Sequence, residues 1–150
     1  MDTVKKYKNF FIMIATASVF MYLTMYLHTY AWDHVFFSET RLYMNLLMTA
    51  VMMLVMLWFM RSMYTDKKIN LYIIGGSVLV FTVSLFLLRS QVYVDDVDYM
   101  EGMIPHHSIA ILTSERAQIS DPRVQELADE IIEAQRREIN EMKQLIEDLD

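Results

Sequence analysis

The chain has 150 residues, of which 55% are hydrophobic, and it contains 14 Met but only 3 Gly, 2 Pro and no Cys. So few turn-forming residues favour helices, and the lack of Cys excludes disulfide frameworks, zinc knuckles and a thiol nucleophile. The net charge of −6 is unevenly spread, because residues 1–90 carry +4 and residues 91–150 carry −10. An acidic C-terminal part argues against nucleic acid as a partner and favours cations.

Three long apolar runs fill the first part of the chain. They extend from Phe10 to about Trp32, from Leu42 to about Met60 and from Leu71 to Leu88, and none contains Asp, Glu, Lys or Arg. Each is close to the roughly 20 residues that a helix needs to cross a bilayer. The first run is longer than the apolar core of a signal peptide and lacks a clear cleavage site, so we expect it to be retained. The sequence predicts a domain of three transmembrane helices over residues 1–90.

Basic residues indicate the orientation of these helices. One side of the predicted bundle carries Lys5, Lys6, Lys8, Arg61, Lys67 and Lys68, whereas the loop between the first two runs has only Arg41. Basic loops stay in the cytoplasm, so the N-terminus is predicted to be cytoplasmic. Three crossings then place residues 91–150 outside the cytoplasm, which we expect to be the periplasm beside a bacterial inner membrane.

Residues 91–150 are predicted to form a second domain, an acidic antiparallel helical hairpin. No Gly or Pro occurs between Leu88 and Gly102, so the third apolar helix has no stop signal where it would leave the membrane. The first hairpin helix is predicted from about Asp95 to Ile119. We expect it to be bent where Gly102 and Pro105 interrupt it, because proline removes a backbone hydrogen bond.

The second hairpin helix is predicted to start at Asp121 and Pro122, which suit the N-cap and the first helical position, and to run to about Leu149. Its side chains repeat with a period of 3.5. The predicted seam comprises Val124, Ala128, Ile131, Gln135, Glu138, Met142, Leu145 and Leu149, and Ile132, Ile139 and Ile146 widen it. Two polar seam positions, Gln135 and Glu138, are costly to bury unless something binds them.

The short turn near Ser120 fixes an approximate register between the two hairpin helices. A residue i of the first helix is expected level with residue 242 − i of the second, within a few residues. This register pairs His107 with Gln135, Met103 with Glu138 and Ile139, and Met100 with Met142. His106 is turned about 100° from the face that carries Met100, Met103 and His107.

This shared face predicts a metal site. Imidazole and thioether donors together favour copper, Cu(I) in particular, and also suit Ag(I), while a carboxylate adds a hard ligand for Cu(II). The candidate ligands are Met100, Met103, His106, His107, Gln135, Glu138 and Met142. The competing interpretation is purely structural, with Met as core filler and histidines that are only hydrogen-bonded. A di-iron centre is disfavoured, because it needs Glu-x-x-His pairs and the sequence has none.

Further Met and His residues lie within and beside the apolar runs. Met44, Met48, Met52, Met56 and Met60 recur every four residues. A thioether track for Cu(I) is one interpretation, but flexible apolar packing is the interpretation we favour. His28 and His34, at the outer end of the first run, are two more candidate ligands. Ser108 beside His107 has no evident third partner, so enzyme activity, such as that of a metal oxidase, is not expected.

Two segments resemble a known family. "YMEGMIPHHSIAILTSERA" and "DPRVQELADEIIEAQRREINEMKQLI" are similar to the domain of unknown function 305 family. The shared motifs are M-x-x-H-H-x-x-A, here Met103, His106, His107 and Ala110, and Q-x-x-E-I-x-x-M, here Gln135, Glu138, Ile139 and Met142. The resemblance implies a ferritin-like helical bundle and, through members of the CopM type, periplasmic copper binding. Residues 1–90 look like those of a membrane-anchored branch.

The sequence departs from the family in two respects. Soluble members often carry another Met where this chain has Leu112, Thr113 and Ser114, so fewer thioethers are expected. Longer members repeat the hairpin, and a single hairpin cannot bury its own seam, so we expect a homo-oligomer that completes an all-α bundle.

The expected function is that of a membrane-anchored, extracytoplasmic copper-binding protein for resistance, storage or delivery. The alternative is a non-catalytic structural or accessory subunit that oligomerises or scaffolds a complex with a membrane-protein partner.

Overall fold

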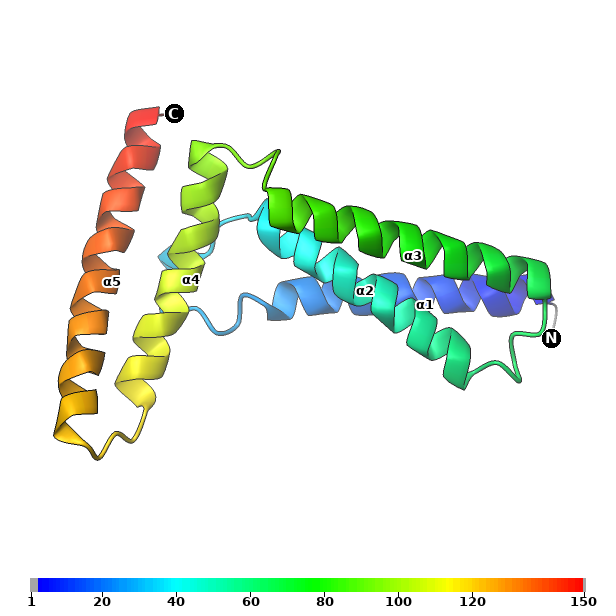
Figure 1. Ribbon diagram of the computed structural model, residues 1–150, viewed down its shortest axis with the longest axis horizontal. Coiled ribbons are helices and arrows are strands. Elements are labelled where there is room, and N and C mark those ends of the chain that lie inside the picture. The colour runs from blue at the N-terminus through cyan, green and yellow to red at the C-terminus, as the bar shows by residue number, and fades with distance from the viewer. Residues whose placement is uncertain (1–2, 150) are drawn as a thin grey trace. The chain divides into compact units, whose positions relative to one another are not determined.

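The computed structural model describes residues 3–149 and is all-α, as predicted. Figure 1 shows the helices in chain order. They are α1 (Thr3–Thr24), the short 3₁₀ helix η1 (Trp32–His34), α2 (Glu39–Phe59), α3 (Lys67–Ser90), α4 (Asp96–Arg116) and α5 (Pro122–Leu149).

The chain folds into two compact units that interleave in sequence. The first unit comprises the chain up to Leu23 together with Thr40–Tyr93, and the second comprises Thr24–Glu39 together with Val94 onward. The segment 24–39 therefore groups with α4 and α5 although it connects α1 to α2. The division into a transmembrane domain and an extracytoplasmic domain stays a prediction.

In the first unit, α1, α2 and α3 share an aromatic and aliphatic core. Its buried members are Tyr7, Phe10, Ile14, Leu57, Tyr64 and Ile73. Met52, Met53, Met56, Met60 and Met63 are partly buried and pack against this core. Three of the five regularly spaced methionines, Met52, Met56 and Met60, therefore pack against this core.

Within residues 3–149, two helices are long and apolar enough to cross a membrane. They are α2, with 21 residues and a mean hydropathy of 2.0, and α3, with 24 residues and a mean hydropathy of 2.3. Only 22% and 17% of their apolar windows are buried, so most of this apolar surface faces outward.

The predicted first helix, from Phe10 to about Trp32, is wrong at its C-terminal end. The helix stops at Thr24, and the chain passes through a turn into η1. Composition alone favours continuation, but the backbone N–H of Tyr30 donates to Ser108 Oγ at 2.7 Å in α4. That tertiary contact requires the segment to leave the helix, and a crossing by α1 stays a prediction.

The end of α3 differs from expectation, whereas α4 begins where the sequence predicts. The third apolar helix does not continue, because Gln91 adopts a left-handed conformation (φ 52°) that closes α3. Asp95 then begins α4 with a capping box shared with Asp98.

The helix α4 continues through Gly102 and Pro105, so these residues do not end it, and the bend at this place stays a prediction. A side chain at Gly102 would lie 3.1 Å from Ser38 Oγ, so this glycine allows segment 24–39 to approach α4 closely.

The helix α5 has the predicted bounds, and Asp121 Oδ1 accepts the backbone N–H of Arg123 at 2.9 Å at its start. Only part of the predicted seam is buried, however. Of the seam, Ala128 is buried and Met142 packs against the core. Ile139 and Ile146, predicted to widen the seam, join Met100, Ile104 and Ile111 in the core of the second unit, with Phe36 and Ile132 packed against them. Val124, Leu145 and Leu149 are exposed.

Candidate functional site: a methionine and histidine groove

A groove with a volume of about 470 Å³ lies between α4 and α5. Its walls are formed by Asp96, Tyr99, Met100, Met103, His107, Glu138, Glu141, Met142, Leu145 and Leu149. Five residues predicted as metal ligands therefore line one cavity: three methionines, one histidine and one glutamate. The predicted register is correct within the few residues allowed, although His107 meets Glu138 rather than Gln135.

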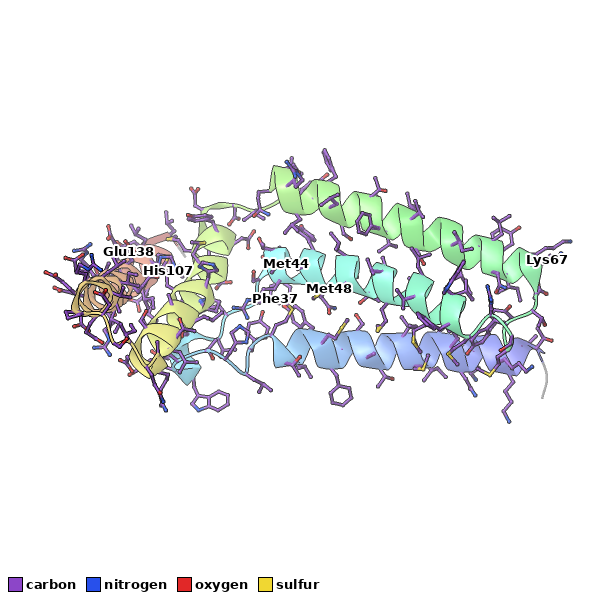
Figure 2. The ribbon with its side chains drawn as sticks, turned by 60° about the horizontal axis from the view of Figure 1, so that its bottom comes forward. Phe37, Met44, Met48, Lys67, His107 and Glu138 are labelled. Atoms are coloured by element: carbon purple, nitrogen blue, oxygen red, sulfur yellow. The ribbon has the colours of Figure 1, made fainter. Side chains whose placement is uncertain are left out.

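His107 is held at both ring nitrogens. Its Nδ1 lies 2.9 Å from the Met103 carbonyl, one helical turn earlier, and its Nε2 lies 2.8 Å from Glu138 Oε2. Figure 2 shows these two labelled side chains pointing toward each other from α4 and α5. The His107 side chain is only 13% exposed, whereas that of Glu138 is 43% exposed.

These contacts fix which His107 nitrogen is available to a ligand. A carbonyl oxygen only accepts hydrogen bonds, so Nδ1 must carry a hydrogen and donate it to Met103. Nε2 then faces the groove, where it shares one hydrogen with Glu138 Oε2, and a metal ion at Nε2 would have to displace that hydrogen. Metal-binding histidines are commonly oriented in this way, by a hydrogen bond from the other ring nitrogen to a backbone carbonyl.

Two of the predicted ligands lie outside the groove. His106 is exposed and does not line it, and its ring centroid is 6.1 Å from that of His107. Gln135 is half-buried one turn away and is also absent from the lining. The predicted rotation of His106 away from the shared face agrees with this placement.

The structure does not bring His28 or His34 to the groove. His28 is exposed in the turn after α1. His34 belongs to η1, and its Nδ1 lies 2.9 Å from Ser108 Oγ. It lines a separate cavity of about 290 Å³ with Tyr30, Asp33 and Arg136.

Contacts around His34 join segment 24–39 to α4 and α5, and they were not predicted from the sequence. We call the contacts of Tyr30 and His34 with Ser108, and of Asp33 with Lys143, the clasp. Ser108 is fully buried, and its Oγ accepts the Tyr30 N–H at 2.7 Å and lies 2.9 Å from His34 Nδ1. Asp33 pairs with Lys143 of α5. These partners are 74 to 110 residues apart in sequence, and no local pattern signals them. Ser108 thus ties segment 24–39 to α4.

Burial determines the protonation of His34. Desolvation lowers the pKa of His34 below its ordinary 6.5, the positive charge of Lys143 lowers it further, and Asp33 opposes both. Burial therefore disfavours the charged form of this ring. Asp33 has a lowered pKa because it accepts a hydrogen bond from Lys143.

The donor set of the groove suits a soft cation better than a hard one. Among residues 3–149, no three His, Asp or Glu side chains are grouped closely enough to hold a metal ion. The groove offers one imidazole, three thioethers and one carboxylate close to that imidazole. Thioether and imidazole donors select copper, Cu(I) above all, rather than Mg²⁺ or Ca²⁺.

Comparison with known proteins found one matching family model and one similar protein. The model of the family "Domain of unknown function (DUF305)" matches residues 90–150. "Uncharacterized protein L153" of Acanthamoeba polyphaga mimivirus is 36% identical over 108 residues, covering 71% of this chain and 69% of that protein. No solved structure matches. Since that alignment is longer than the matched domain and covers most of both proteins, the chain belongs to the DUF305 family.

Proposed function

We propose that the protein is a membrane-anchored, extracytoplasmic copper-binding protein that serves resistance, storage or delivery. The observation that carries the proposal is the position of His107. Its Nε2 lies in a groove lined by Met100, Met103 and Met142, while its Nδ1 is tied to a backbone carbonyl. A ligand nitrogen is thus already oriented among three soft donors.

Copper fits the chemistry of this groove. A bound Cu(I) ion would take the Nε2 lone pair of His107 and thioether sulfurs, and Glu138 would move from the imidazole to the rim or contribute a hard donor to Cu(II). The chain has no Cys, so these are its soft ligands. Because the metal takes the place of a proton, copper affinity is expected to rise with pH.

The membrane part of the proposal is supported by the first unit. The outward-facing apolar surfaces of α2 and α3 suit a lipid environment better than water. We include α1 as a third crossing, although its lysines leave only the part from Phe10 to Thr24 apolar. Tyr7 donates to Asn70 Oδ1 at 2.7 Å, so the basic start of α1 lies beside the basic start of α3. The positive-inside rule assigns this shared end to the cytoplasm.

The test is a Cu(I) titration of the detergent-solubilised full chain against a competing chelator. We expect one tight site in the wild type and loss of that site in the double variant His107→Ala/Met103→Leu. His106→Ala is the matched control, because it removes the neighbouring imidazole from a position outside the groove. Equal affinity in the double variant and in the control would refute the proposal.

A second candidate function rests on the exposed row of α5. Val124, Leu127, Leu145 and Leu149 are 44% to 59% exposed, which favours a non-catalytic subunit that self-associates or scaffolds a membrane complex. This candidate predicts an oligomer that survives metal chelators and dissociates in Leu127→Glu. Glu126→Gln is the control on the neighbouring face. An oligomer that needs copper would instead favour the metal-binding function.

A further inference from the structure

The first unit has a groove of its own, whose lining differs from that of the methionine and histidine groove. It has a volume of about 310 Å³ and lies between α2 and α3, at the end where α2 finishes and α3 begins. The lining residues are Leu54, Leu57, Trp58, Arg61, Asn70 and Ile74. The groove is thus mostly apolar, with one cationic side chain, Arg61, in its lining.

The Arg61 side chain is held by Trp58 but has no carboxylate partner among the ion pairs of residues 3–149. Its guanidinium carbon lies 5.4 Å from the centroid of the Trp58 ring, within the range of a cation–π contact. No Asp or Glu carboxylate within residues 3–149 forms an ion pair with it. The charge is therefore oriented at the groove without a protein anion to satisfy it.

The polar end of the groove is held by a fixed network. Asn70 accepts from the Tyr7 hydroxyl at 2.7 Å and donates to the Tyr64 carbonyl at 2.8 Å. Asp66 is engaged as the N-cap of α3, accepting from the backbone N–H groups of Lys68 and Ile69. Since these side chains are committed to each other, Arg61 is the charged side chain in the groove lining that can bind a ligand.

We propose that this groove binds an anionic phospholipid, with the phosphate at Arg61 and one acyl chain along Leu54, Leu57 and Ile74. A guanidinium matches phosphate in charge and in hydrogen-bond geometry. Lys5, Lys6, Lys8, Lys67 and Lys68 surround the same end, and basic residues at a membrane surface attract anionic lipid headgroups. A soluble phosphate would leave the apolar wall unused, so the groove as a whole fits a lipid.

The inference goes beyond copper binding and rests only on the proposed placement of α2 and α3 in a membrane. The test is native mass spectrometry of the full chain, in detergent with equal amounts of dioleoylphosphatidylglycerol and dioleoylphosphatidylcholine. We expect the wild type to retain the anionic dioleoylphosphatidylglycerol in preference to the zwitterionic dioleoylphosphatidylcholine. Arg61→Gln should lower that retention about fivefold, the effect of one basic residue at a lipid headgroup. Glycerol 3-phosphate, which has the phosphate without chains, should not displace the lipid.

Two matched controls separate the groove from general charge and from general apolar surface. Lys67→Gln removes one positive charge at the same end but outside the groove, and it should change retention less than twofold. Ile74→Trp fills the groove and should lower retention, whereas Leu79→Trp, on exposed apolar surface of α3 outside the groove, should not.

Equal effects of Arg61→Gln and Lys67→Gln, or equal retention of both lipids by the wild type, would overturn the inference while leaving the membrane anchor intact. Recovery of the protein without detergent would instead overturn the anchor, and the copper titration is independent of both results.

Discussion

His107 and His34 lie in the same compact unit and are almost equally buried, with side chains 13% and 12% exposed, yet their surroundings differ. His107 donates from Nδ1 to a carbonyl and directs Nε2 into the methionine groove. His34 Nδ1 contacts the Ser108 hydroxyl at 2.9 Å, and its ring does not line that groove. The comparison teaches that burial does not make a histidine a ligand. The carbonyl partner at Nδ1 of His107 leaves Nε2 to face the groove beside Glu138, whereas the Ser108 partner at Nδ1 of His34 holds that ring elsewhere.

The largest expected effect separates the two histidines by copper affinity. His107→Ala should raise the dissociation constant for Cu(I) roughly 100-fold or more, because even outer partners of a ligating histidine are worth 10- to 100-fold. His34→Ala should change it less than about threefold. Competition with a chromogenic Cu(I) chelator measures both constants. A comparable loss in the two variants would show that the assignment from Nδ1 partners is wrong.

Removing the hydroxyl of Ser108 tests the clasp. In Ser108→Ala the Tyr30 N–H and His34 Nδ1 lose a buried partner, and the second unit should be destabilised by about 1–3 kcal/mol. Hydrogen exchange of α4 and α5 amides in the solubilised full chain measures this change. Ser114→Ala, on the same helix, is the control. If both variants exchange alike, the clasp contributes nothing to stability.

Replacing the thioether of Met142 tests whether the methionines of the groove contribute to copper affinity. Met142→Leu keeps a similar volume and should cost less than about 1.5 kcal/mol of stability. It removes a sulfur donor, so Cu(I) affinity should fall about tenfold, equivalent to about 1.4 kcal/mol. Met56→Leu, in the core of the first unit, should leave copper affinity unchanged. An unchanged affinity in Met142→Leu would remove this residue from the ligand set.

The smallest effect is a pH dependence that belongs to His34. The folded chain resists protonation of this ring, because burial and Lys143 lower its pKa despite the nearby Asp33. The unfolded chain binds that proton below about pH 6.5, so the free energy of unfolding should fall as the pH drops below this value. The fall ends below the folded pKa.

The free energy of unfolding of the full chain is measured between pH 5 and pH 8 by hydrogen exchange of the Tyr30 amide in increasing denaturant. The exchange rates are corrected for the intrinsic pH dependence of exchange. His34→Asn is the control, since its amide oxygen can accept from Ser108 but does not titrate. The variant should lose part of the pH slope. An identical slope in wild type and variant would assign the dependence to other groups.

The fold was predictable where the signals are local. The apolar runs of α2 and α3 and the Asp121–Pro122 start of α5 lie within the elements that they specify, and the structure confirms these helices. The facing of Met100, Met103 and His107 toward Met142 followed from helical spacing and a short turn. The same reasoning failed for the apolar run that ends at Trp32, because composition does not reveal that Tyr30 binds Ser108.

The sequence by itself determined that the chain is helical, that α2 and α3 are apolar enough to cross a membrane, and which Met and His residues share a helical face. Periodicity and capping act within a few residues, so they can be read from the chain directly. Only the tertiary structure decided that His107 meets Glu138, that His34 is committed to Ser108, and that Ile139 and Ile146 rather than Leu145 and Leu149 form the core. Those outcomes depend on how segment 24–39 packs against α4 and α5, which is set by contacts between residues far apart in sequence.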